Sequence, residues 1–199
     1  WGPAQYDRRH RLVGGFVWDI PFFKNSSNWF AKNVLAGWQL SGNFHYTSGQ
    51  PFTVQAGSND FYWDFNKDGL GKDRPLWLGD NPQEIIKWNH GFPYLDGNYF
   101  GIPNPPAGPD DLSYYDQTFA TRNMFYWFPT HNINLSLQKY FTFNVGNREV
   151  TLQLIGEVFN VLKSYFWDLP NVSFHSASFG EVSRMNGVRE AQFSIRVMF

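Results

Sequence analysis

The stretch Gln192-Phe193-Ser194-Ile195-Arg196-Val197-Met198-Phe199 alternates apolar and mostly polar residues from one end to the other. Successive side chains of a β-strand point to opposite faces. One face of this strand therefore carries Phe193, Ile195, Val197 and Phe199. Such a strand fits the wall of a membrane barrel, with apolar side chains toward lipid and polar ones toward a wet lumen. An edge strand of a soluble sandwich has the same pattern, so the rest of the chain has to decide.

The composition favours β-structure with one apolar and one polar face. Aromatic residues make up 20% of the 199 residues, while charged residues make up only 17% and the mean hydropathy is −0.44. The net charge of −1 gives no indication of a nucleic-acid partner. The absence of cysteine excludes disulfides, thiolate metal sites and cysteine nucleophiles. No apolar run reaches 18 residues, so no membrane helix is predicted, but barrel strands do not form such runs.

Five segments alternate in the manner of strands, and they are about 9–20, 37–52, 131–142, 150–161 and 190–199. One face of these strands is apolar, and the other carries mainly neutral amides and hydroxyls. A strand facing bulk water would normally carry Lys and Glu, whereas neutral polar groups suit a lumen. We therefore expect the following side chains to face a lumen: Gln39, Ser41, Asn43, His45, Asn132, Asn134, Ser136, Gln138, Gln153, Glu157, Ser194 and Arg196.

The connections between these strands alternate between short and long. The segment 55–129 holds eight of the twelve prolines and ten of the seventeen acidic residues, and the segment 162–189 is a second long connection. Outer-membrane barrels have short periplasmic turns and long extracellular loops, whereas a sandwich has no reason to sort its loops in this way. The sequence predicts an all-β fold for residues 1–199: an antiparallel transmembrane β-barrel segment with one very long extracellular loop, in the bacterial outer membrane.

Five strands are too few for a barrel, since small barrels need about eight. Open sheet edges are not tolerated in lipid. We therefore expect the chain to contact membrane lipid and to pair with further strands, from the same protein or from another chain. We interpret the chain as the C-terminal segment of a longer protein.

Several motifs resemble the C-terminal barrel region of TonB-dependent receptors, and of the branch with an N-terminal carboxypeptidase-regulatory-like domain in particular. The motifs are Tyr6–Val13, Trp18–Pro21, Gly37–Gly42, Ser48–Phe52, Asp73–Pro75, Glu157–Val161 and Phe199. The resemblance implies a 22-stranded barrel around a plug, of which these are the last five strands, with ligand bound at extracellular loops for uptake. It further implies that Phe193, Ile195, Val197 and Phe199 form the signal read by the barrel-assembly machinery. An energy-coupling protein would act through the N-terminal part, which this sequence lacks.

The run from Asp64 to Gly69 resembles the start of a calcium loop, because Asp64, Asn66 and Asp68 place oxygen ligands at alternate positions before a glycine. Pro75 occupies the position at which such a loop has its bidentate Glu, and Asp60 or Asp73 is the substitute. The two interpretations are a Ca²⁺ site in the 60–73 loop and a solvated acidic loop. No other cofactor is expected.

The sequence contains no nucleophile elbow, phosphate loop or closely spaced set of His, Asp and Glu, so we expect no enzyme activity. Two alternatives to the transporter segment stay open at this point. One is a soluble, aromatic-rich β-sandwich that binds carbohydrate, and the other is a structural chain in a multi-chain surface assembly.

Overall fold

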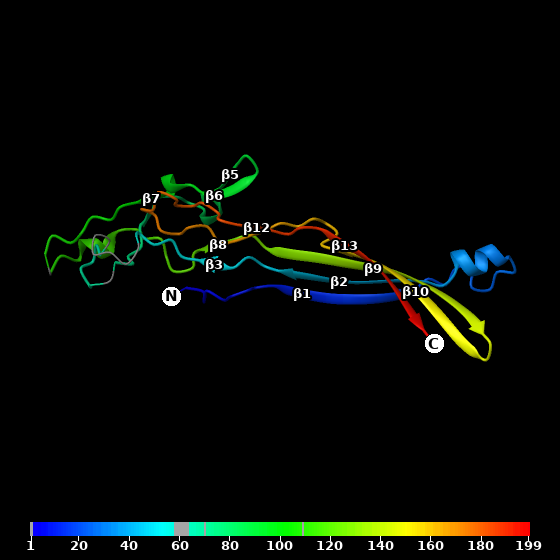
Figure 1. Ribbon diagram of the computed structural model, residues 1–199. Helices are drawn as coiled ribbons and strands as arrows, with labels where there is room; N and C mark the ends of the chain where they lie inside the picture. The colour runs from blue at the N-terminus through cyan, green and yellow to red at the C-terminus, as the bar shows by residue number, and fades with distance from the viewer. Residues whose placement is uncertain (1, 58–63, 70, 109) are drawn as a thin grey trace. The chain divides into compact units, whose positions relative to one another are not determined.

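The computed structural model describes residues 2–57, 64–69, 71–108 and 110–199 (Figure 1). The chain forms two compact units. Unit 1 consists of residues 1–9, 48–129 and 166–186, and unit 2 consists of residues 10–47, 130–165 and 187–199. Regular structure is almost entirely β, and no described helix is long and apolar enough to span a membrane.

Unit 2 is a single antiparallel sheet, in the order β1-β2-β9-β10-β13 (Figure 1). Its strands are β1 (Arg11–Asp19), β2 (Trp38–Thr47), β9 (Thr130–Val145), β10 (Arg148–Phe159) and β13 (Glu190–Met198). These correspond to the five segments expected from the sequence, and the all-β fold class is confirmed. The expected strand 37–52 is too long, because β2 ends at Thr47 and Pro51–Phe52 forms β3 in unit 1.

The strand register places the polar residues of neighbouring strands opposite one another. Gln39 pairs with Gln138, Ser41 with Ser136, Asn43 with Asn134 and His45 with Asn132. The other face of the sheet is apolar, and many of its side chains are exposed, including Phe16, Phe193 and Ile195. Because unit 2 leaves these apolar side chains exposed, we expect something other than this unit to cover them.

The two ends of the sheet carry different connections. At one end, β9 and β10 are joined by the two residues Gly146 and Asn147, with Gly146 at a φ of 62°. At the other end, the chain passes into the segments of unit 1. Within the described residues, β1 and β13 each have one neighbouring strand, so the sheet has two open edges.

A lysine stands on the apolar face near the end of the sheet that carries the β9–β10 turn. Lys139 of β9 is 3% exposed and pairs with Trp38. Its ammonium group donates to the carbonyl of Ala36 and lies 5.9 Å and 4.7 Å from the ring centroids of Trp38 and Phe141. The Trp38 indole donates to the carbonyl of Val34, 3.1 Å away. These groups hold the end of η1 (Ala31–Leu35), a turn of π-helix in the β1–β2 connection, against the sheet.

Unit 1 contains the expected long loop, which has more regular structure than the sequence indicates. Its short strands are β3 (Pro51–Phe52), β4 (Leu76–Trp77), β5 (Ile86–Asn89), β6 (Phe92–Leu95), β7 (Phe100–Gly101), β8 (Phe125–Tyr126), β11 (Phe166–Trp167) and β12 (Met185–Asn186). They pair as β3–β8, β4–β7, β5–β6 and β11–β12. The described residues of the unit also form the 3₁₀ turns η3 (Pro82–Ile85), η4 (Gly97–Tyr99) and η5 (Leu112–Asp116).

An aromatic core holds these short ladders together. The Phe125 ring lies 5.6 Å from Phe52, 5.3 Å from Trp77 and 5.7 Å from Phe100, measured between ring centroids. Offset and edge-on ring pairs at such separations stabilise a core beyond the burial of their area. Unit 1 therefore has an interior of its own.

Candidate functional site

The candidate site is the polar face of the five-stranded sheet. Strand alternation brings onto this face the even-numbered residues of β9 and the odd-numbered residues of β2 and β10. Asn134 of β9 donates to the Oδ1 of Asn43 on β2, 2.9 Å away, and its own Oδ1 accepts from the backbone N–H of Asn160 at 2.9 Å. The Asn134 side chain thus joins β2 to the residue that follows β10.

Tyr140 is the hub of a second network on this face. Its hydroxyl donates to Gln138 Oε1 at 2.9 Å, lies 3.4 Å from Gln39 Oε1, and accepts from Gln153 Nε2 at 3.0 Å. Gln153 Nε2 also donates to Gln138 Oε1 at 2.7 Å, and Gln39 Nε2 donates to Asp19 Oδ1 at 2.7 Å. The network therefore runs from β1 to β10, and Gln153 is only 5% exposed within it.

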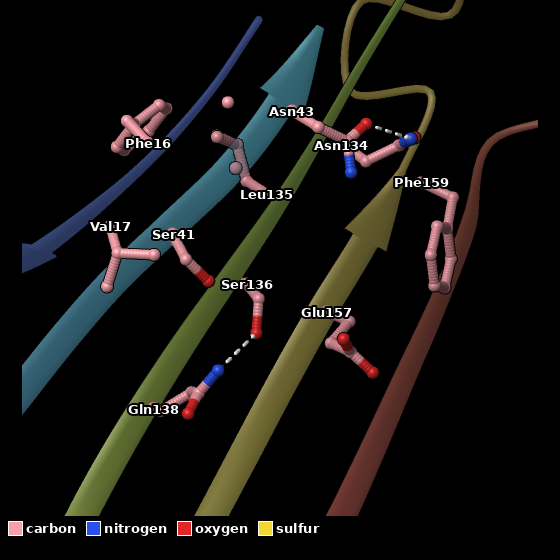
Figure 2. Close-up of a pocket in the computed structure, with 12 residues that line it drawn as sticks. Phe16, Val17, Ser41, Asn43, Asn134, Leu135, Ser136, Gln138, Glu157 and Phe159 are labelled. Atoms are coloured by element: carbon pink, nitrogen blue, oxygen red, sulfur yellow. Dashed lines mark hydrogen bonds between the residues drawn. The ribbon is translucent and has the colours of Figure 1, made fainter.

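A shallow hollow of about 440 Å³ lies beside these groups (Figure 2). Ser41, Asn43, Asn134, Ser136, Gln138 and Glu157 line it, together with the apolar Val17 and Phe159. In Figure 2, Gln138 and Ser136 are joined by a hydrogen bond, which is 3.3 Å long. The hollow offers neutral donors and acceptors and one carboxylate, which suits contact with water or a polar solute.

The remaining polar side chains expected at the lumen share this face. Ser194 and Arg196 of β13 pair with Ile155 and Gln153, and Glu157 accepts from Gln192 Nε2 at 2.5 Å. Asn132 Oδ1 is buried and has no hydrogen-bond partner within the described residues. The structure thus brings the expected residues onto one face of one sheet. That this face borders a lumen stays a prediction.

Three contributors to this face were missed by the sequence analysis, namely Asp19, Tyr140 and Asn160. Tyr140 has the same parity as Asn132 to Gln138, and that signal would have found it. Asn160 has a φ of 52°, and its side chain donates to the carbonyls of Ser164 and Gly187 at 3.0 Å and 2.8 Å. It thereby fixes the start of the connection after β10. No local pattern indicates those partners.

A comparison with protein families finds that the outer membrane beta barrel domain matches residues 1–192. The chain belongs to this family. It is accordingly a protein of the bacterial outer membrane, and the alternative of a soluble carbohydrate-binding sandwich is wrong. The search of curated proteins found no match. The search of solved structures found no match either.

The expected calcium loop lies in unit 1 and is described only in part, since residues 60–63 and 70 lie outside the described residues. Asp64 accepts from the backbone N–H groups of Asp68 and Gly69 at 2.9 Å and 2.8 Å, and Asn66 Oδ1 accepts from Asp68 at 3.0 Å. Asp73 accepts from the N–H of Asn66 at 3.0 Å, and burial raises the pKa of its carboxyl. The oxygen atoms are thus gathered in one turn, and the calcium site stays a prediction. No cluster of three or more His, Cys, Asp or Glu side chains able to hold a metal occurs in the described part of the chain.

Proposed function

We propose that this outer-membrane chain forms part of the wall of a TonB-dependent receptor that binds a ligand at its extracellular loops and admits it along a polar lumen. The remaining strands and the plug come from the same protein, and the complete barrel has 22 strands. Contact with an energy-coupling protein belongs to the part of the protein outside this chain.

One observation carries the proposal, and it is the network of neutral amides and hydroxyls on one face of a sheet that is apolar on the other. Such side chains hydrogen-bond to water and to a passing polar solute without the strong binding that charged groups would cause. The open edges of β1 and β13 fit a sheet that continues into further strands. The motifs that resemble TonB-dependent receptors support the finer assignment within the family.

The exposed apolar face of β13 supports a role in barrel assembly as well. Phe193, Ile195 and Val197 are 56–67% exposed along this face, and Phe199 follows at the end of the strand. We propose that these four side chains are the signal that the barrel-assembly machinery reads before lipid covers them.

Uptake measured in whole cells tests the transport proposal. The strain that produces the complete protein would be compared with one lacking the energy-coupling protein, and each would be measured with and without a protonophore. We expect ligand to bind at the surface in every case and to accumulate only in the energised, coupled cells. Accumulation that ignores both treatments would mean passive diffusion through a pore, and would rule out the receptor mechanism.

A further inference from the structure

A second hollow, of about 1010 Å³, lies within unit 1 and is lined by three basic residues. Lys72, Arg74 and Arg122 are all exposed on its wall. None of the described residues that line it is acidic, although unit 1 as a whole has thirteen acidic and only eight basic residues. The hollow thus concentrates positive charge on a unit whose overall charge is negative.

Lys72 and Arg74 line the hollow, whereas Asp73, which stands between them in the sequence, does not. Asp73 is engaged elsewhere, since it accepts from the backbone N–H groups of Phe65 and Asn66 at 2.7 Å and 3.0 Å. The charged groups of Lys72, Arg74 and Arg122 form no hydrogen bond or ion pair with another described residue. All three side chains are exposed, so a solute can reach them.

Hydrogen bonds between distant segments of the chain hold the wall of the hollow in place. Asn123 is 4% exposed and donates to the carbonyl of Pro3 at 2.6 Å, while its Oδ1 accepts from the Thr53 hydroxyl at 3.0 Å. The N–H of Gln55 donates to the carbonyl of Val172 at 3.0 Å. Four distant segments of the chain are thus tied together beneath the basic residues. A preorganised wall lowers the entropic cost of binding.

We propose that this hollow binds an organic anion with at least two acidic groups, such as carboxylates or sulfates, on a polar body. The guanidinium groups of Arg74 and Arg122 suit the planar, bidentate recognition of such groups, and Lys72 adds a point charge. The side chains of Gln5 and Gln55 on the wall provide neutral donors and acceptors for the body of the ligand. This inference rests on the proposed ligand-binding role of the receptor and names the class of ligand.

Isothermal titration of the complete, detergent-purified protein tests this site. The probes are a sulfated hexuronate disaccharide and the neutral disaccharide maltose. We expect the sulfated probe alone to bind, and more weakly as salt screens the charges. Each of Lys72→Gln, Arg74→Gln and Arg122→Gln should weaken binding about tenfold, because each removes a charge-assisted contact.

Lys87→Gln is the matched control. Lys87 is a basic residue of unit 1 outside the hollow, and its ammonium group donates to the Tyr99 hydroxyl at 3.2 Å. This variant should bind the sulfated probe as the parent protein does. No binding of the sulfated probe, or equal binding by the parent and by the triple Gln variant, would overturn the proposal. Because the titration needs no energy coupling, such a failure is separate from a failure of the uptake experiment.

Discussion

Units 1 and 2 differ in where they place their apolar side chains. Eleven of the twelve buried apolar side chains among the described residues lie in unit 1, which packs several of its aromatic rings into a core. Unit 2 displays its apolar residues outward and keeps its polar groups on the opposite face. Unit 1 carries thirteen acidic residues and unit 2 only four. The apolar side chains of unit 1 thus pack on one another, whereas those of unit 2 lie exposed on one face of the sheet, which we propose is covered by lipid.

The largest expected effect comes from removing the centre of that core. Phe125→Ala deletes a ring that is 0% exposed and contacts three other rings, so unit 1 should lose about 3–5 kcal/mol of stability. The five-stranded sheet of unit 2 contains none of these rings, so we expect it still to resist denaturation by detergent. Limited proteolysis of the membrane-embedded protein measures the loss in unit 1.

Leu112→Ala provides the control for this change, since Leu112 is a 69% exposed apolar residue of the same unit. It should alter stability by no more than about 0.5 kcal/mol. Equal protease sensitivity in the two variants would contradict a core centred on Phe125.

The apolar face of unit 2 is tested by two neighbouring residues of one strand. Ile195 is 61% exposed on the apolar face, and Ser194 points to the polar face. Ile195→Arg places a charge toward lipid at a cost of about 2–4 kcal/mol at mid-membrane depth, whereas Ser194→Arg does not. Heat-modifiable migration on a gel reports the folded fraction of each variant.

Because Ile195 packs against little else in unit 2, a soluble protein would tolerate both changes. The difference between the two variants therefore separates a lipid-facing strand from a merely exposed one. Equal folding of Ile195→Arg and Ser194→Arg would show that the two faces of β13 are not in different solvents.

The strands were predictable because apolar and polar residues alternate along them, as successive side chains of a strand point to opposite faces. The same parity would have placed Tyr140 on the polar face and Lys139 on the apolar one. Unit 1 could not be predicted in this way. Its strands are two to four residues long, and its central contact joins Phe52 to Phe125, which are far apart in the sequence.

Disrupting the hydrogen-bond network around Tyr140 should lower the stability by a smaller amount. Tyr140→Phe removes the hydroxyl that joins Gln39, Gln138 and Gln153, and we expect a loss of about 1–2 kcal/mol, because each net hydrogen bond contributes about 0.5–1.5 kcal/mol. Urea unfolding of the reconstituted protein measures the loss. Tyr46→Phe is the control, since Tyr46 lies on the apolar face and its hydroxyl bonds to no other described residue. Similar losses for both variants would argue against Tyr140 as a hub.

The calcium prediction is tested on unit 1. If the turn around Asp64 binds Ca²⁺, a chelator should lower the unfolding temperature of unit 1 by a few degrees, as binding to the native state stabilises it. Asp64→Asn should abolish the response. An unchanged unfolding temperature after chelation would leave the solvated acidic turn as the explanation.

The smallest effect concerns Asp111, the N-cap of η5. Its carboxylate accepts from Ser113 and Ala107, and these hydrogen bonds lower its pKa to about 2 from 3.8. A lowered pKa stabilises the folded state above pH 3.8, and this contribution is lost as the pH falls toward 2. In the Asp111→Asn variant, the unfolding temperature of unit 1 should therefore fall less than in the parent protein as the pH is lowered from 3.8 toward 2. An equal fall in both proteins would assign the pH dependence to other carboxylates.

Lys139 has a consequence for the order in which the wall is built. Its ammonium group is accommodated on the apolar face only because Ala36, Trp38 and Phe141 enclose it, and two of these belong to or precede β2. A β9–β10 hairpin entering the bilayer alone would carry that charge uncovered. We therefore expect β9 to enter the bilayer together with β2, because Ala36 and Trp38 supply the carbonyl and one of the rings that enclose this charge.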